Sequence, residues 1–134
     1  IIGYILAPTL EAKYTIEALQ QAISHAGSGN LCGTIHHSDR GVQYCCDEYI
    51  TLLKEHHIRI SMTEDSNPTD NGMAERVNGI IKNEFLEPLQ TPKNLLEALP
   101  LVDHAVRTYN TLRPHLNLNM RTPAQVYEGK QIIL

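Results

Sequence analysis

The sequence contains no tryptophan, one phenylalanine and three cysteines, and it has no excess of positive charge. Three cysteines, two of them adjacent, do not match the paired disulfide framework of a small secreted domain, so we expect a reducing, cytoplasmic environment. No run of about 18 apolar residues occurs, so we expect no membrane-spanning helix and no membrane partner. With 134 residues, 42% of them hydrophobic, the chain is long enough to bury the core of one domain.

The charge of the chain is unevenly distributed. The formal net charge of −4 argues against a domain that holds DNA by phosphate neutralisation alone. Residues 1–74 carry four Lys or Arg against nine Asp or Glu, whereas residues 75–134 carry seven against six. We therefore expect carboxylate chemistry in the first half, and DNA contacts in the second half or in partner segments.

The hydrophobic pattern predicts an α/β fold in which residues 1–134 form one domain, with a C-terminal tail from about residue 115. Short apolar runs predict buried strands at 1–6, 31–36 and 58–62. Helical spacing predicts a helix that Thr9 caps and that runs to Ala26, a second helix at 45–57, and a third from Met73 to Phe85. Residues 63–71 are polar and predict a mobile loop beside the third helix.

The C-terminal part of the sequence predicts mainly helix. Thr91 and Pro92 have the pattern of a helix start, and the long helix that follows should be kinked or split by Pro100. It should end near Leu112, before Pro114. Thr122 and Pro123 predict the cap of a last helical turn that extends through Val126.

Two carboxylates stand at positions that suit metal chemistry. Asp39 follows the second predicted strand, and Glu75 stands near the start of the third predicted helix, with 35 residues between the two. Open α/β sheets bind ligands at the carboxyl ends of their strands, and Mg²⁺ prefers oxygen ligands. These residues are therefore candidate ligands of a shared divalent metal. On spacing alone, a turn residue and a solvated helix residue remain the alternative.

Further polar residues near this pair could contact DNA. Lys82 follows Glu75 by two helical turns on nearly the same face, where it could reach a phosphate. Asn71 lies at the junction of loop and helix, where it could contact DNA or cap the helix. Zinc binding is not favoured, because the spacing of the nearby His and Cys residues fits no usual zinc pattern: His36, His37, Cys45, Cys46.

Several motifs occur along the chain in a fixed order: H-S-D-R-G-V-Q-Y, S-N-P-T-D-N-G-M-A-E-R, K-N-E and Y-N-T-L-R-P-H. Together they resemble the integrase catalytic core of bacterial insertion-sequence transposases, which are relatives of retroviral integrases. The resemblance covers nearly the whole chain. It implies a ribonuclease-H-like fold, dependence on Mg²⁺ or Mn²⁺, and DNA cleavage with strand transfer by a polynucleotidyl transferase.

The resemblance also implies roles for individual residues. By position, Asp39 resembles the second catalytic Asp and Glu75 the catalytic Glu, and both would be metal ligands. Lys82 is similar to the lysine that contacts DNA near the cut end. Arg113 belongs to the Y-N-x-x-R-P-H hallmark, as a candidate DNA contact or as part of a helix terminator.

The same resemblance predicts that the core is incomplete at its N-terminus. The family's first catalytic Asp lies on a strand upstream of Ile1, so we expect that the first two strands and one metal ligand are missing. Such a fragment should bind metal weakly and be poorly active by itself. Its unpaired sheet edges should favour a homo-oligomer, formed in part by strand exchange.

Two other functions are consistent with the sequence. One is a ribonuclease-H-like nuclease, which hydrolyses DNA or RNA and never joins strands. The other is a non-enzymatic transposase remnant that acts by binding DNA or by oligomerising.

Overall fold

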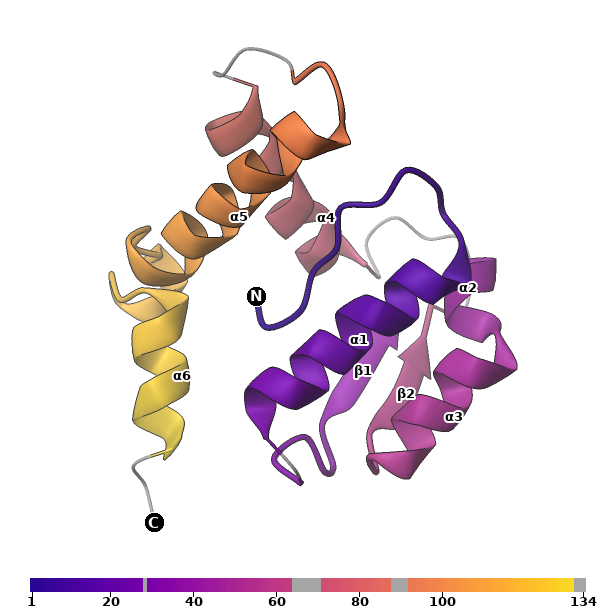
Figure 1. Cartoon of the computed structure of the whole chain (residues 1–134). Helices are drawn as coiled ribbons and strands as arrows, with labels where there is room; N and C mark the ends of the chain where they lie inside the picture. The colour runs from indigo at the N-terminus through magenta and orange to yellow at the C-terminus, as the bar shows by residue number, and fades with distance from the viewer. Residues whose placement is uncertain (28, 64–70, 88–91, 132–134) are drawn as a thin grey trace. The chain divides into compact units, whose positions relative to one another are not determined.

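The computed structural model describes residues 1–27, 29–63, 71–87 and 92–131. The described ranges form a mixed α/β structure with one parallel sheet, which agrees with the predicted fold class (Figure 1). Contacts divide the chain into two compact units, residues 2–75 and residue 1 with 76–134, which we describe separately. The elements in chain order are α1 (Ala12–Ala26), β1 (Ile35–Ser38), α2 (Val42–Cys45), α3 (Asp47–Glu55), β2 (Arg59–Met62), α4 (Gly72–Ile80), η1 (Ile81–Leu86), α5 (Leu95–Thr111), η2 (Leu116–Leu118) and α6 (Pro123–Gln131).

The first unit is built around the parallel pair β1 and β2, whose register aligns Ile35 with Arg59 and Ser38 with Met62. Parallel strands need a crossover between them, and here α2 and α3 provide it. In Figure 1, α1 and α3 lie on the same side of the sheet. Between these helices and the start of β2 lies the core of the unit, which consists of Ile16, Leu19, Tyr49, Leu53 and Ile58.

The strands predicted at 31–36 and 58–62 both exist, although their boundaries differ from the predicted ones. The strand predicted at 31–36 begins at Ile35, because residues 31–33 form turns and Gly33 has a φ of 77°, which excludes extended structure. The strand predicted at 58–62 is observed as β2.

Helix α1 occurs where it was predicted and ends at Ala26, but the expectation that Thr9 caps it is wrong. The helix begins at Ala12 after Glu11, and the Thr9 hydroxyl donates to Glu11 Oε1 (2.8 Å) instead of capping the helix. The helix predicted at 45–57 is observed as α3, and the extended backbone of Cys46 separates it from the short helix α2.

The prediction of a strand at 1–6 is wrong, since these residues are half-buried but form no strand. A Cβ atom on Gly3 would lie 2.2 Å from the carbonyl oxygen of Ala18 and 2.9 Å from the Cβ of Ala22. The segment therefore packs closely against α1. An apolar run predicts burial, but a strand also needs a neighbour to accept its backbone hydrogen bonds, and the described residues place none beside it.

The second unit contains η1, the long helix α5, and α6, and both η1 and α6 pack against α5. Its buried apolar residues are Ala105, Val106 and Tyr109, all on α5. Helix α5 is capped by Asn94, whose side chain accepts a 3.0 Å hydrogen bond from the Glu97 amide. The start predicted at Thr91 and Pro92 is wrong, because Pro92 is not helical and the helix begins at Leu95. Thr91 itself lies outside the described residues.

Helix α5 is continuous through Pro100, so it is not split there, and the alternative of a kink stays a prediction. Proline lacks the N–H group that would bond to the carbonyl of Leu96. Leu96 is 80% exposed, so water can satisfy that carbonyl and the helix continues.

The last helix confirms the predicted cap and extends further than the single turn expected. The Gln125 amide donates to Thr122 Oγ1 (3.3 Å), and the Thr122 amide donates to Gln125 Oε1 (2.9 Å). This reciprocal pair is a capping box, and α6 then runs from Pro123 to Gln131. Residues 115–131 are thus folded against α5 rather than forming an irregular tail.

Among the helices that the structure describes, none combines the length and the apolar character needed to cross a membrane. The loop predicted at 63–71 falls largely on residues 64–70, which lie outside the described residues. The prediction of one domain over 1–134 stays a prediction.

The core of the first unit leads to a stability prediction. Leu53 is fully buried, so Leu53→Ala should lower the free energy of unfolding by about 2–5 kcal/mol through lost burial and a residual cavity. Leu10→Ala is the matched control, because Leu10 is 87% exposed in the same unit and its loss should cost less than about 0.5 kcal/mol. Urea denaturation measures both variants. Equal destabilisation by the two would contradict the described core.

Candidate functional site

Asp39 lies where the sequence predicts it, directly after the carboxyl end of β1, with an exposed side chain. Its Oδ1 atom accepts a 2.9 Å hydrogen bond from the Gly41 amide. This is the local turn that aspartate commonly forms with the backbone two residues later. The turn fixes the orientation of the carboxylate at the edge of the sheet, where parallel strands end together.

The residues beside Asp39 attach this turn to the end of β2. The Thr63 amide donates to the Ser38 carbonyl (3.1 Å), which extends the parallel pairing by one residue. The Arg40 Nε donates to the Thr63 carbonyl (2.7 Å). Ser38 and Thr63 are both buried, so the bond between them is shielded from water, whereas Arg40 is exposed and its bond is only partly buried. Asp39 is therefore presented by a connection that is anchored on both sides.

Glu75 lies in the first turn of α4, also as predicted, and its side chain is exposed. Its amide donates to the carbonyl of Asn71 (3.2 Å), the half-buried residue that precedes the helix. A carboxylate in the first turn is stabilised by the positive end of the helix dipole.

Asp39 and Glu75 belong to the same compact unit, and both carboxylates are accessible to a cation from solvent. Within the described ranges, no three His, Cys, Asp or Glu side chains gather closely enough to hold a metal ion. The donor chemistry of the pair suits Mg²⁺, which is commonly held by one or two carboxylates together with substrate phosphate. That these two residues share one cation stays a prediction.

The histidines near Asp39 take part in packing and strand pairing. His36 Nε2 lies 2.9 Å from the Tyr49 hydroxyl, and its ring packs against Tyr44 and Tyr49. Burial lowers the pKa of His36, which favours a neutral core residue. On the opposite face, His37 Nδ1 lies 2.9 Å from Ser61 Oγ across the strand pair. These contacts engage one ring nitrogen of each histidine, His36 Nε2 and His37 Nδ1.

Tyr44 is a neighbour of Asp39 that sequence reasoning did not identify. Burial raises the pKa of its hydroxyl, and the negative charge of Asp39 raises it further. Tyr44 therefore stays protonated beside the carboxylate. Tyr44 precedes the helix predicted at 45–57, and its signal in the sequence was its place at the end of the H-S-D-R-G-V-Q-Y motif that contains Asp39.

Lys82 lies in η1, where the helix widens to π-helical geometry. The Glu87 amide donates to the Lys82 carbonyl (2.8 Å), a bond across five residues that is typical of this geometry. The same spacing brings Glu87 Oε1 to 4.0 Å from Lys82 Nζ. Both side chains are more than half exposed, so this ion pair is weak and a phosphate could replace it.

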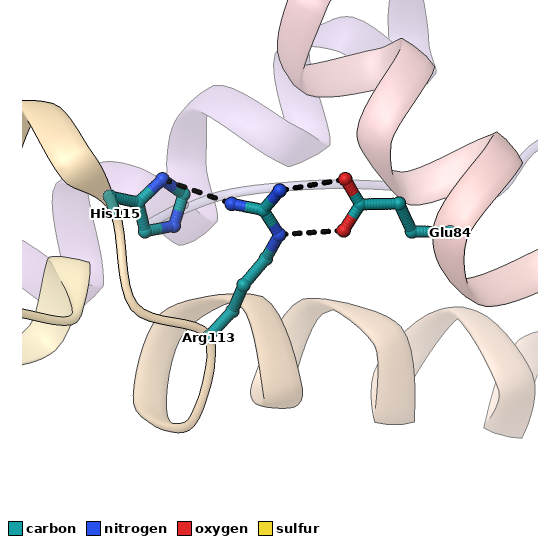
Figure 2. Close-up of polar contacts among 3 residues, drawn as sticks. All are labelled: Glu84, Arg113 and His115. Atoms are coloured by element: carbon teal, nitrogen blue, oxygen red, sulfur yellow. Dashed lines mark hydrogen bonds and ion pairs between the residues drawn. The ribbon is translucent and has the colours of Figure 1, made fainter. Parts of the chain in front are cut away.

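Arg113 is engaged within the second unit (Figure 2). Its Nε and Nη2 atoms each lie 2.7 Å from one oxygen of Glu84, which forms a bidentate ion pair between η1 and the second residue after α5. Arg113 holds the pKa of Glu84 below its usual range. Glu84 is part of the K-N-E motif, but no pattern in the sequence indicates that it pairs with Arg113, 29 residues away.

His115 completes this group. Its Nδ1 lies 3.3 Å from Arg113 Nη1, which requires Nδ1 to be the acceptor and places the ring hydrogen on Nε2. The ring packs edge-on against Tyr109, with centroids 4.8 Å apart. Burial lowers the pKa of His115, and the charge of Arg113 lowers it further, so the ring is neutral. Figure 2 shows the linear order of Glu84, Arg113 and His115.

Comparison with known proteins agrees with these features. The family model described as "Integrase core domain" matches residues 56–123. The transposase for insertion sequence element IS629 of Shigella sonnei is 31% identical over 125 residues, which cover 93% of this chain and 41% of the relative. The chain thus spans about two fifths of the length of this relative.

Solved structures with a similar fold include the HTLV-2 integrase catalytic core domain in complex with magnesium. Its dimeric form has a TM-score of 0.70 and 26% identity, over 93% of this chain and 74% of that one. Its trimeric form has a TM-score of 0.61 and 28% identity, over 86% and 68%. The predicted ribonuclease-H-like fold is thereby confirmed, and the chain belongs to the integrase core domain family.

Proposed function

We propose that this chain is part of the catalytic core of an insertion-sequence transposase, which cleaves DNA and transfers the cut strand to a target. The proposal is supported by the family membership and by the identity to the IS629 transposase. The observation that carries it is the placement of two exposed carboxylates, Asp39 at the end of a strand and Glu75 in the first turn of a helix, within one compact unit.

Asp39 and Glu75 would hold the divalent metal, Mg²⁺ or Mn²⁺. When bound, such ions activate the attacking hydroxyl and stabilise the leaving oxygen of a phosphodiester. The chain contributes the orientation of its ligands. The Gly41 amide holds Asp39 Oδ1, and the bond from Arg40 to Thr63 keeps the turn at the end of β2. Glu75 keeps its place through the hydrogen bonding of the first turn of α4.

DNA is the proposed substrate, and Lys82 is the proposed phosphate contact. Its exposed ammonium group is engaged only weakly by Glu87. Asn71, at the start of α4, is a second candidate contact. Arg113 is a weaker candidate than the sequence suggested, because three of its nitrogens already meet Glu84 and His115. These contacts would grip the DNA backbone and not select a sequence.

We also propose that the protein acts as a homo-oligomer. The HTLV-2 core with the same fold is described in dimeric and trimeric forms. Within the described ranges the sheet has only two strands, so each has one edge without a partner, and an edge of this kind can pair with a strand of another copy.

The metal assignment predicts the effect of neutralising each carboxylate. In the gene product at its natural length, Asp39→Asn or Glu75→Gln should reduce strand transfer by more than about 10³-fold, because a metal ligand is lost. The assay uses a DNA end with a pre-cut 3′ hydroxyl, so joined product separates a transposase from a nuclease that only hydrolyses.

Glu55→Gln serves as the matched control, because Glu55 is an exposed carboxylate in the same unit, at the end of α3. It should retain nearly full activity. Joined product from either site variant at the level of this control would contradict the assignment. Cleavage without any joining by the unaltered protein would favour the nuclease.

The role of Lys82 predicts a change in the salt dependence of DNA binding. Lys82→Ala should weaken binding equally across DNA sequences and lower the slope of log K against log salt by about 0.9, as expected for one lost phosphate contact. Lys54→Ala is the control, since Lys54 is exposed on α3 in the other unit. Fluorescence anisotropy at several salt concentrations measures both. An unchanged slope in Lys82→Ala would remove this residue from the interface.

A further inference from the structure

We propose that Arg113 is a positioning residue, whose bidentate ion pair with Glu84 fixes the π-helical segment η1 and thereby sets the position of Lys82 for DNA. This inference rests on the proposed function in one respect, namely that Lys82 contacts DNA. It goes beyond that function because it assigns a role to a group of residues outside the proposed metal site.

The π-helical geometry of η1 needs support from other contacts. A π-helical segment has poorer hydrogen-bond geometry than an α-helix and is usually short, so it persists where other contacts favour it. Here it spans Ile81–Leu86, directly after α4. The wider turn changes the direction of every side chain that it carries. Lys82 projects from the backbone of this segment, so a contact that fixes the segment also fixes the point from which the lysine side chain extends.

The ion pair between Arg113 and Glu84 connects η1 to the end of α5. Arg113 meets both oxygens of Glu84 at 2.7 Å, in the planar two-bond arrangement that gives arginine its directional specificity. Glu84 lies in η1, two residues after Lys82, and Arg113 follows the end of α5. The Arg113 side chain is 26% exposed and the Glu84 side chain 46%, so water weakens the pair only in part.

Arg113 is itself supported by contacts with the residues that follow α5 and with the buried face of α5. His115 Nδ1 receives the remaining Nη1 group at 3.3 Å, and the His115 ring packs on Tyr109, which is buried on α5. The His115 amide also donates to the Arg121 carbonyl (3.1 Å), which closes the turn after α5. Arg113 is thus held from the core of the second unit, and a lysine could not reproduce its paired hydrogen bonds.

These contacts separate positioning from direct DNA binding. For Arg113 to bind a phosphate, it would have to release Glu84 and leave that carboxylate without its partner. Lys82 has no comparable cost, because its contact with Glu87 is at 4.0 Å between exposed side chains. The two basic residues of this unit that sequence analysis linked to DNA therefore have different tasks.

The first experiment is a double-variant cycle on DNA affinity, with Arg113→Ala and Lys82→Ala made singly and together. If Arg113 acts through Lys82, each single variant should weaken binding by roughly three- to tenfold, and the double variant should be no weaker than Lys82→Ala alone. Additive losses, with a further reduction of the salt slope by about 0.9, would show that Arg113 contacts phosphate itself and would overturn the proposal. Arg107→Ala, an exposed arginine on α5, is the control and should leave affinity unchanged.

The second experiment measures η1 without DNA. Hydrogen exchange of the amides in residues 81–86 should become faster in Arg113→Ala and in Arg113→Lys, and slow again when the pair is reversed in the double variant Glu84→Arg with Arg113→Glu. Unchanged exchange in Arg113→Ala would show that the ion pair with Glu84 does not fix η1, and it would overturn the proposal whatever the result for DNA binding. Faster exchange with no DNA binding by the unaltered protein would refute the proposed function and the link to Lys82 instead. The two failures are therefore distinguishable.

Discussion

The parallel pairing of β1 and β2 is the constraint on which the proposed metal site depends. Two parallel strands end at the same edge, so residues that follow them are brought together although a crossover separates them in sequence. The core around Leu53 holds that crossover against the strands. Asp39 follows β1 at this edge, and Thr63 follows β2 and is bonded to both neighbours of Asp39. The position of the carboxylate is a consequence of the sheet.

The sequence predicted the local setting of both carboxylates, since each depends on short-range signals. A strand followed by Asp-Arg-Gly and a helix start after Asn-Gly are patterns of a few residues. The same holds for α1 and for the capping box at Thr122. Where the signal was an apolar run alone, the prediction for residues 1–6 was wrong, because burial against α1 gives the same pattern as burial in a sheet.

The contacts that could not be predicted from the sequence join residues far apart in the chain. No single-sequence pattern links Glu84 to Arg113, and the two are paired only once η1 lies along α5. The sequence of the Y-N-x-x-R-P-H segment is consistent with either a DNA contact or a helix terminator. The structure adds specific contacts: Tyr109 packs on His115, Asn110 donates to the Ile1 carbonyl, and Arg113 binds Glu84. Such a segment can be specific in sequence because it holds a unit together.

The central claim, that Asp39 and Glu75 act on one divalent cation, is tested most directly by Mn²⁺ binding, followed by electron paramagnetic resonance of the free ion. The affinities of the unaltered chain, Asp39→Asn, Glu75→Gln and the double variant form a thermodynamic cycle. A shared ion predicts strong coupling, so that either single variant loses nearly as much affinity as the double. Independent losses that simply add, or Mn²⁺ affinity that neither substitution changes, would contradict the account.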